Sequence, residues 1–495
     1  MFLKNFLIDS EQITDISLAR TIIETQEVRI ETQEVRINQL ETHSIKQERL
    51  LTNHIIKLEE RISYLEKNSS NSSKPPSSDI VKPQHEQRQK GKRKIGGQSR
   101  HKGSHRLPYS PEDVDKIVEP ELSQCPMCGG EVCLADNKNP WVIQQAELVS
   151  KPVEITEYRL SYYYCAKCKK YHRVDLPAGV REQDICGARL QACIAHLKGV
   201  SGISHRELQT HLKEVFDFKI SIGGISNIIK RVSAALLPAY EELGAAVRRE
   251  HLLHVDETGW KDKGLRHWAW VCCNKHIAYF HIANSRSTDV LHGILGEKFS
   301  GALISDFYSV YVKFANVKQQ FCLAHLIRDI KFLTTLSSDI VKSFGDKLLE
   351  YFANIFKLWH RKNELPIDQL RAKLKRQTTR LCNFLSRDGE REGHVYKMKK
   401  RLFKHWKSLF RFAQHPEMYE PTNNCAEQTL RIVTKIRYLT QGTRSRWGQA
   451  WWSRILSVIG TCKKLKTSSF QCILALINAN IDGDNSPTIL ANYNL

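Results

Sequence analysis

The stretch His251-Leu-Leu-His-Val-Asp-Glu-Thr-Gly-Trp260 decides the fold class of this chain. An apolar, β-prone run leads directly into an acidic residue, Asp256, which is typical of a buried strand that delivers a carboxylate to its end. More strands are predicted at 267–272, 277–282, 302–305 and 320–323, with a helix at 287–295 between the third and fourth strands.

Three antiparallel strands, a helix and a fourth strand that ends in an acid are the element order of the ribonuclease H-like fold. Asp306 follows the fourth strand directly. Because the first and fourth strands are neighbours in that fold, we expect Asp256 and Asp306 to share a metal, although 50 residues separate them (306 − 256). The alternative stays open that each acid is a surface or capping residue, since an acid often follows an apolar strand.

Converging carboxylates suit the cutting of a phosphodiester. Two divalent ions about 3.5–4 Å apart can activate the attacking oxygen and stabilise the leaving oxygen. Mg²⁺, or Mn²⁺ in its place, prefers a few carboxylates together with water and phosphate oxygens.

A second metal site is predicted from Cys125, Cys128, Cys165 and Cys168, which form two Cys-x-x-Cys pairs. Four thiolates suit a tetrahedral, structural Zn²⁺ with no open position for catalysis. The partly alternating run Val153–Leu160 between the pairs predicts the hairpin of a zinc ribbon, within a DNA-binding domain at 118–180. Cys133 and His172 are alternative ligands.

Residues 10–67 predict one long helix with the seam of a coiled coil. Leu51, Ile55, Leu58, Ile62 and Leu65 are spaced 4, 3, 4 and 3 residues apart, and Glu24–Ile30 is repeated identically at Glu31–Ile37. This seam indicates self-association as a homodimer or higher oligomer. The alternative is that the helix packs within its own chain.

A polar linker is predicted at 68–110. It includes nine Lys and Arg between Lys82 and Arg106, against the single acid Glu86. Such a composition cannot bury a core, so the segment is either a solvated linker, an arm that contacts DNA phosphates without specificity, or both.

Residues 187–245 predict a helical domain of the helix-turn-helix type. Ser204 and Glu207 form a capping-box pattern, and Ser221 can cap a second helix at 222–232 that carries Lys230 and Arg231. These two basic residues are candidate DNA contacts, although any helical connector would look similar.

The composition agrees with several modules acting on nucleic acid. The 75 Lys and Arg exceed the 53 Asp and Glu, a formal charge of +22, which favours a polyanionic partner such as DNA. No apolar run is long enough to cross a membrane, and the 14 cysteines indicate reduced thiols. We therefore expect a cytoplasmic protein, associated with the nucleoid when it acts on DNA.

Five motifs resemble, in their order, the transposases of bacterial insertion sequence 66. They are the segment Asn68–Asp79, Gly96-Gly-Gln98 with His101-Lys-Gly103, the two cysteine pairs, His254–Trp260, and Asn423-Asn-Cys-Ala-Glu427. The resemblance covers about residues 50–475. It implies a DDE transposase in which Glu427 is the third catalytic acid. The family commonly has Arg after this Glu, whereas this chain has Gln428.

The resemblance implies a catalytic domain at 250–480 with a helical insertion at about 330–420, since Glu427 lies 121 residues beyond Asp306 (427 − 306). The fold class is therefore multidomain α+β: coiled coil, zinc ribbon, helix-turn-helix and ribonuclease H-like core. Arg431 and Lys435 share a helix face with Glu427 and are candidate phosphate contacts, unless that face is merely solvated.

Two further features are candidates for holding DNA. Gly442–Gly448 reads as a basic, flexible loop whose Arg444 and Arg446 could grip a DNA end. Cys322 and His325 resemble a Cys-x-x-His pattern of such enzymes, so His325 either contacts the scissile strand or packs.

The sequence thus predicts metal-dependent 3′-end cleavage and strand transfer of an insertion sequence. The partners would be the element's terminal repeats, the target DNA and, as the resemblance leaves open, accessory proteins encoded by the element. The alternatives are a sequence-specific DNA-binding regulator and a metal-dependent nuclease, both derived from a transposase.

Overall fold

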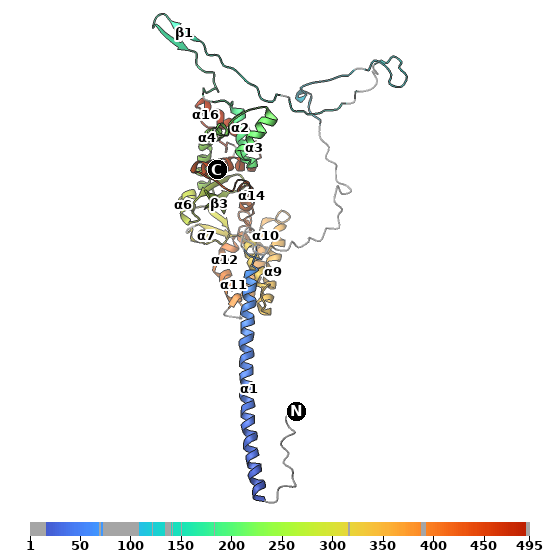
Figure 1. Cartoon of the computed structure of the whole chain (residues 1–495), viewed down its shortest axis with the longest axis vertical. Coiled ribbons are helices and arrows are strands. Elements are labelled where there is room, and N and C mark those ends of the chain that lie inside the picture. The colour runs from blue at the N-terminus through green and yellow to red at the C-terminus, as the bar shows by residue number, and fades with distance from the viewer. Residues whose placement is uncertain are drawn as a thin grey trace. The chain divides into compact units, whose positions relative to one another are not determined.

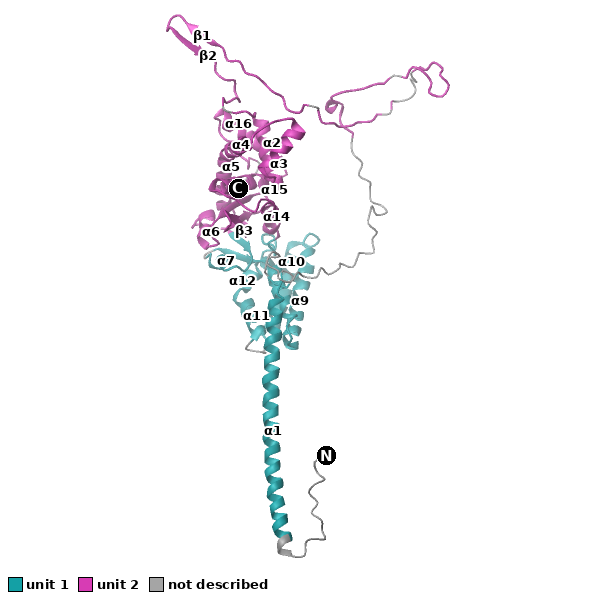
Figure 2. Ribbon diagram, in the orientation of Figure 1, with its two compact units in different colours: residues 1–83, 302–423 teal, residues 84–301, 424–495 magenta. Residues whose placement is uncertain are grey.

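The chain forms two compact units, which are coloured separately in Figure 2. One unit comprises residues 1–83 and 302–423, and the other comprises residues 84–301 and 424–495. The computed structural model describes residues 16–68, 71–72, 108–120, 122–133, 140, 142–149, 151–182, 184–314, 317–387 and 393–491. The predicted basic arm from Lys82 to Arg106 and the first residues of the predicted coiled coil lie outside the described residues.

The first unit is largely helical (Figure 1). Its described elements are α1 (Ile16–Leu65), β6 (Ala302–Ser305), α7 (Ser309–Lys313), β7 (Lys318–Phe321), α8 (Leu323–Leu333), α9 (Asp339–His360), α10 (Ile367–Leu385), α11 (Gly393–Lys404), α12 (Trp406–Leu409) and α13 (Arg411–Gln414).

The long helix α1 exposes its apolar seam. Ile23, Ile37, Leu51 and Leu58 are each more than half exposed. Near its end the helix contacts α8 and the residues after it: the Tyr64 ring lies 5.1 Å from the Phe332 ring of α8, and Ser63 Oγ donates to the Thr335 carbonyl at 3.5 Å. The predicted intramolecular packing therefore accounts for the last turn of α1, and the remaining seam stays open for self-association.

The region at about 330–420, which was predicted to be helical, forms helices α9 to α13. Two of the short helices are fastened to β7 by one buried side chain. Gln320 donates from Nε2 to the Leu409 carbonyl at 2.9 Å, and its Oε1 accepts from the Phe412 amide at 2.9 Å. The parallel pair β6 and β7, with Ala302 opposite Lys318, is thereby joined to the helical part of the unit.

The second unit combines strands and helices. Its described elements are a 3-10 helix (Pro111–Asp113), β1 (Tyr162–Cys165), β2 (Lys170–Arg173), α2 (Ala188–Ser201), α3 (His205–Phe216), α4 (Ile222–Ala235), α5 (Leu237–Arg249), β3 (Leu252–Asp262), β4 (Leu265–Cys273), β5 (Ala278–Ala283), α6 (Thr288–Leu295), α14 (Asn424–Thr440), α15 (Arg446–Leu465) and α16 (Ser469–Asp482).

The antiparallel meander β3-β4-β5 forms the sheet portion of this unit, with Asp256 opposite Val271 and Val271 opposite Phe280. The order β3, β4, β5, α6, β6 and β7 follows the predicted order of strands and helix. The predicted end of the first strand at Asp256 was wrong, because β3 continues to Asp262, where residues 254–262 pair with β4. Val271 and Phe280 are buried on the face of Asp256, and Val255 is buried on the opposite face. A slip of one residue would exchange the two faces, so this burial specifies the register.

A row of hydroxyls on α15 covers the outer edge of β5. Ser453, Ser457 and Thr461 are spaced four residues apart, so they lie on one face of the helix. Their oxygens accept the amides of Ile282, Phe280 and Ala278 at 3.2, 2.8 and 3.1 Å, respectively. An edge strand that would otherwise present open amides is thus paired with a helix.

The helical segment before the sheet has the predicted caps. Ser204 accepts the Glu207 amide and Glu207 accepts the Ser204 amide, which completes the capping box at the start of α3. Ser221 Oγ accepts the Gly224 amide at 3.0 Å and begins α4. The two predicted helices therefore begin where α3 and α4 begin, and the second continues three residues beyond its predicted end, to Ala235.

The predicted hairpin strand Val153–Leu160 was wrong, because that run forms no strand in the structure. The hairpin begins at Tyr162 instead, with β1 and β2 in antiparallel register and Cys165 opposite Lys170. A strand needs a partner for its backbone groups, and the four-residue turn after Cys165 lets the tyrosine-rich run pair with residues 170–173.

Helices and strands in two units give a mixed chain that is consistent with the multidomain α+β class. Within the part of the chain that the structure describes, no helix is both long enough and apolar enough to cross a membrane.

Candidate functional site

Asp256 lies in the middle of β3 and is half-buried. Its Oδ1 accepts the Glu257 amide at 2.9 Å, which orients the carboxyl group. Because side chains alternate along a strand, Glu257 points to the opposite face, where the Arg286 Nε donates to its Oε1 at 2.6 Å. The two adjacent acids therefore have different surroundings, and Glu257 forms an ion pair with Arg286.

Helix α14, which carries Glu427, packs on the Asp256 face of β3. Arg437 donates from Nη1 to Thr258 Oγ1 at 3.1 Å and to the Gly259 carbonyl at 2.6 Å. Thr258 shares its face with Asp256 because the two residues are two positions apart. Sequence reasoning missed Arg437, since nothing local in the sequence links it to a strand 178 residues earlier.

The first turn of α14 is fixed near the start of β3, at the end of its partner strand β4. Cys425 Sγ lies 3.7 Å from Cys273 Sγ, and Lys464 Nζ lies 3.4 Å from Cys425 Sγ. Cys273 is directly opposite His254 in the β3-β4 pair. Glu427 is two residues after Cys425 and Asp256 is two residues after His254, so the structure brings the turn with Glu427 next to the strand with Asp256.

Asp306 belongs to the first unit and follows β6 directly. Its Oδ1 accepts the Tyr308 amide at 2.9 Å, which makes a tight turn that orients the carboxyl group. The preceding Ser305 is fully buried, and its carbonyl accepts the Cys322 amide at 2.8 Å. This bond extends the parallel pairing of β6 and β7 up to the acid.

Cys322 and His325 also lie in the first unit, at the start of α8. Cys322 is fully buried, and its sulfur accepts the Asn423 amide at 3.2 Å. The cysteine thus packs against the backbone before α14. His325 follows in the first turn of α8 and is half-buried.

Arg431 and Lys435 are exposed on α14, at four and eight residues beyond Glu427. Lys435 Nζ lies 3.5 Å from the Val200 carbonyl at the end of α2. The two cations therefore form a solvent-facing row on the helix of the third acid, which fits either a phosphate contact or a solvated face.

The segment Gly442–Gly448 is more ordered than the flexible loop that we expected. The Thr443 amide donates to the Lys261 carbonyl and the Lys263 amide donates to the Thr443 carbonyl, both at 2.8 Å. Trp260 Nε1 donates to Thr443 Oγ1 at 3.2 Å. Gly442 has a φ of +99°, and a Cβ there would collide with the Lys261 backbone, so only glycine fits this position.

This anchoring presents the basic residues of the segment in fixed places. Arg444 is exposed beyond the anchor, and Arg446 and Trp447 stand in the first turn of α15, where Ser445 Oγ accepts the Gly448 amide at 3.2 Å. Lys230 Nζ of α4 lies 5.4 Å from the centre of the Trp447 ring. Lys230 therefore lies beside the first turn of α15, which also carries Arg446.

Arg231 has a different environment from Lys230. Its Nε lies 3.1 Å from Asp184 Oδ1. The guanidinium group is therefore already engaged within the second unit. Of the two basic residues on α4, Lys230 is the one beside the Gly442–Gly448 segment.

Lys198, near the end of α2, is a buried cation. Burial lowers the pKa of Lys198 to about 8, and burial together with the Lys198 charge lowers the pKa of His205 to about 4. Lys198 Nζ donates to the Ile203 carbonyl at 3.1 Å. Buried apolar residues of α3 and α4, among them Leu208, Leu212 and Ile225, belong to the same hydrophobic core.

Each cysteine pair forms a local knuckle. Hydrogen bonds from the backbone amides of Met127 and Cys128 lower the pKa of Cys125, and hydrogen bonds from the amides of Cys168 and Lys167 lower the pKa of Cys165. Such amides favour the thiolate form that a metal needs. However, no three of the four cysteine sulfurs, all of which the structure describes, lie within 4.8 Å of one another.

Comparison with known proteins gives two matches. A family model described as the Transposase IS66 family matches residues 183–450, which is more than half of the chain. A family of unknown function, DUF6444, matches residues 19–107. No curated protein matches the chain. The chain therefore belongs to the Transposase IS66 family. Membership of this family implies a role in transposition and DNA as a partner.

Proposed function

We propose that this protein is a DDE transposase that cleaves the 3′ ends of an insertion sequence and joins them to target DNA. The catalytic residues would be Asp256, Asp306 and Glu427. One observation supports this most: α14 packs on the Asp256 face of β3 and brings the turn of Glu427 next to that strand. Membership of the transposase family supports the type of reaction.

The donor set fits Mg²⁺ or Mn²⁺. Three carboxylates offer the hard oxygen ligands that these ions prefer. When bound, the ions would activate water or a 3′-hydroxyl and stabilise the leaving oxygen. The chain's own contribution is orientation: the Glu257 amide on Asp256 and the Tyr308 amide on Asp306 each hold one carboxyl oxygen, which leaves little reorganisation for metal binding.

The proposal includes a ribonuclease H-like core over 250–480, in which the strands of Asp256 and Asp306 would be neighbours. The element order of β3, β4, β5, α6 and β6 supports it. The helical insertion would be α9 to α13, close to the expected 330–420.

DNA would be held by the exposed cations of the second unit. Arg431, Lys435, Arg444, Arg446 and Lys230 are candidates, with His325 from the first unit as a contact to the scissile strand. Each phosphate contact by Lys or Arg releases counterions, so binding should weaken steeply with salt. Arg231 is the least suited of the proposed contacts because it pairs with Asp184.

We also assign accessory modules. The predicted domain at 118–180 would hold Zn²⁺ through Cys125, Cys128, Cys165 and Cys168, supported by the two thiolate-favouring knuckles. Helices α3 and α4 would form a helix-turn-helix within 187–245. The predicted coiled coil at 10–67, followed by the linker at 68–110, would join chains into a homodimer or higher oligomer, supported by the exposed seam of α1.

The test is an in vitro reaction of the full chain with Mg²⁺ and DNA that carries the element's terminal repeats. We expect nicking at the 3′ ends and joined products, and we expect Asp256→Asn, Asp306→Asn and Glu427→Gln each to lower joining by about 10³-fold or more. Asp289→Asn is the matched control, since Asp289 is an exposed carboxylate in the first turn of α6.

DNA binding without divalent ions serves as the folding check for each variant. Full joining activity in any of the three variants would refute the carboxylate assignment. Nicking without joining by the unaltered chain would favour a nuclease derived from a transposase, and binding without either reaction would favour a DNA-binding regulator.

A further inference from the structure

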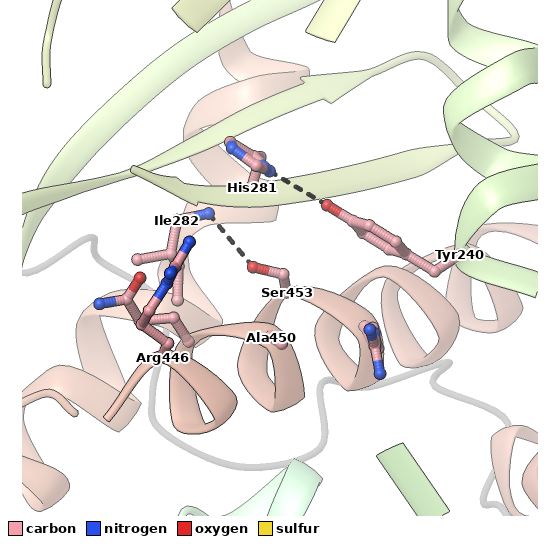
Figure 3. Close-up of a pocket in the computed structure, with 8 residues that line it drawn as sticks. Tyr240, His281, Ile282, Arg446, Ala450 and Ser453 are labelled. Atoms are coloured by element: carbon pink, nitrogen blue, oxygen red, sulfur yellow. Dashed lines mark hydrogen bonds between the residues drawn. The ribbon is translucent and has the colours of Figure 1, made fainter. Parts of the chain in front are cut away.

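A small pocket lies in the second unit between α15, β5 and α5. It has a volume of about 210 Å³ and is lined by Tyr240, His281, Ile282, Arg446, Gln449, Ala450, Ser453 and Arg454. Figure 3 shows Arg446 and Ser453 on α15, below the strand of His281 and Ile282. Tyr240 lies at the opposite end of the pocket from Arg446, with its hydroxyl group directed at His281.

The size of the pocket limits its occupant to a small group. At roughly 30 Å³ per water molecule, the pocket has room for about seven waters. This is below the roughly 300 Å³ at which pockets for drug-sized ligands begin. A phosphate with the adjoining sugar oxygens is of a suitable size.

The charge of the pocket favours an anion. Two of the lining residues are arginines and none is acidic. Burial lowers the pKa of His281 below its ordinary value, so the imidazole is neutral at pH 7 and the positive charge comes from Arg446 and Arg454. Within the described part of the chain, neither arginine forms an ion pair with a carboxylate. Glu241 influences Arg454 electrostatically but does not line the pocket.

The walls of the pocket are held by hydrogen bonds. Tyr240 Oη donates to the Phe280 carbonyl at 3.1 Å and lies 3.2 Å from His281 Nδ1, and its ring stacks on Tyr279 at 4.7 Å. Arg454 Nη1 donates to the Ser233 carbonyl at 2.8 Å. A site of this kind is preorganised, so little ordering is needed when a ligand binds.

Arg446 stands at an electrostatically unfavourable place. It is the first residue of α15, whose opening turn contains no acid. The positive end of the helix dipole repels a cation there and attracts an anion. A bound phosphate would therefore satisfy both Arg446 and the N-terminus of the helix at once.

We propose that this pocket binds a phosphate group, and that its source is the backbone of a DNA strand lying along the α4 and Gly442–Gly448 surface. The DNA source rests on the proposed function. Arg446 connects the pocket to this surface. It lines the pocket and is followed by Trp447, whose ring lies beside Lys230. A strand held by Arg444 and Lys230 would thus deliver a phosphate to the pocket mouth.

The experiment measures two ligands on the full chain without divalent ions. A short fluorescein-labelled DNA duplex is titrated by anisotropy between about 50 and 200 mM salt, and inorganic pyrophosphate is titrated by calorimetry. The variants are Arg446→Gln and Arg454→Gln, with Arg446→Lys as the variant that retains charge. Arg249→Gln is the matched control. Arg249 is exposed at the end of α5, so this substitution removes one positive charge at another place in the same unit.

We expect Arg446→Gln to weaken DNA binding about tenfold at about 100 mM salt and to reduce the salt slope by about one. Arg446→Lys should retain most of the slope, and Arg249→Gln should change affinity less than about twofold. Arg446 is exposed, so its variants keep the fold, which circular dichroism checks. Arg454→Gln tests the pocket wall separately.

Three outcomes decide the proposal. Loss of slope with Arg446→Gln but not with Arg249→Gln supports it with DNA as the source. Loss of pyrophosphate binding with unchanged DNA binding supports the phosphate site and overturns the DNA source. Equal behaviour of the Arg446 and Arg249 variants toward both ligands overturns the proposal. If the unaltered chain binds DNA through Arg446 but neither nicks nor joins it, the proposed function fails while the phosphate site stands.

Discussion

Helices α1 and α15 are both long, yet they differ in what covers them. Apolar residues of α1 such as Leu51 and Leu58 remain 64% and 59% exposed, whereas on α15 Trp451 is 1% exposed and Ile455 is fully buried. Helix α15 contacts β5 as well as helices α2, α4, α5 and α16. Apolar periodicity therefore predicts a helix and its apolar face in both cases. Only long-range packing decides whether other parts of the same chain cover that face.

The hydroxyl groups of the two helices differ in the same way. Thr42 of α1 donates back to the Asn38 carbonyl of its own helix at 2.7 Å and is exposed. Ser457 of α15 is fully buried and accepts the Phe280 amide of a strand 177 residues earlier. A hydroxyl side chain thus bonds only within its own helix at Thr42, whereas at Ser457 it is the hydrogen-bond acceptor for the edge of the sheet.

The largest effect is expected from truncating the α15 core. Trp451→Ala should lower the free energy of unfolding of the second unit by about 3–5 kcal/mol, because it removes a fully buried indole and leaves a cavity. Urea unfolding followed by far-ultraviolet circular dichroism measures the loss. Leu51→Ala in α1 is the matched change, and should cost less than about 0.5 kcal/mol at concentrations where the chain is monomeric. Equal losses would contradict the comparison.

A smaller effect is expected from the hydroxyl row. Ser457→Ala should cost about 1–3 kcal/mol, because the Phe280 amide would be buried without its acceptor. The Phe280 amide should also exchange its hydrogen faster, which nuclear magnetic resonance or mass spectrometry can follow. Thr42→Ala in α1 is the control and should change stability by less than about 0.5 kcal/mol. Unchanged exchange at Phe280 would show that the edge strand does not depend on α15.

The smallest effect on the free energy of unfolding is expected from substitutions in the exposed seam of α1. Their effect on the mass of the oligomer should be large. The double variant Leu51→Lys with Leu58→Lys should leave the unfolding of the second unit within about 0.5 kcal/mol. It should reduce the oligomer to monomers in analytical ultracentrifugation, because charged residues cannot pack in a coiled-coil seam. Thr52→Lys with Glu59→Lys places the same residues off the seam. If both pairs dissociate the oligomer equally, the seam is not the interface.

The candidate site was predictable to different extents. The strand of Asp256 and the strand that ends directly before Asp306 were predicted because a short apolar run followed by an acid is a local signal. The resemblance of Asn423–Glu427 to a family motif indicated Glu427, and the family match over residues 183–450 confirms the recognition on which that prediction rested. Arg437, Cys273 and Lys464, which fix the helix of Glu427, were not predicted because their partners are far away in the sequence.

The second unit also shows a local signal that was misread. Residues 153–160 have the alternation of a strand, but strand formation requires a partner, and the pairing falls at 162–173 instead. Each cysteine pair forms its knuckle from local contacts, since the amides that bond Cys125 and Cys165 lie within three residues of them. Their joining into one zinc site remains a prediction, because it depends on how two knuckles separated by 36 residues come together.

The sequence by itself determined the long helix α1 with its seam, the order of strands and helix around Asp256 and Asp306, the caps at Ser204 and Ser221, and the family. These properties depend on residues within one or two turns of each other, so a pattern in the sequence records them. Only the tertiary structure decided that α15 covers the edge of β5, that α14 lies on the Asp256 face, and that Thr443 fastens the basic segment to β3. Such contacts form between surfaces that the folding of the whole unit creates, and their free energy depends on shape and burial that no local pattern contains.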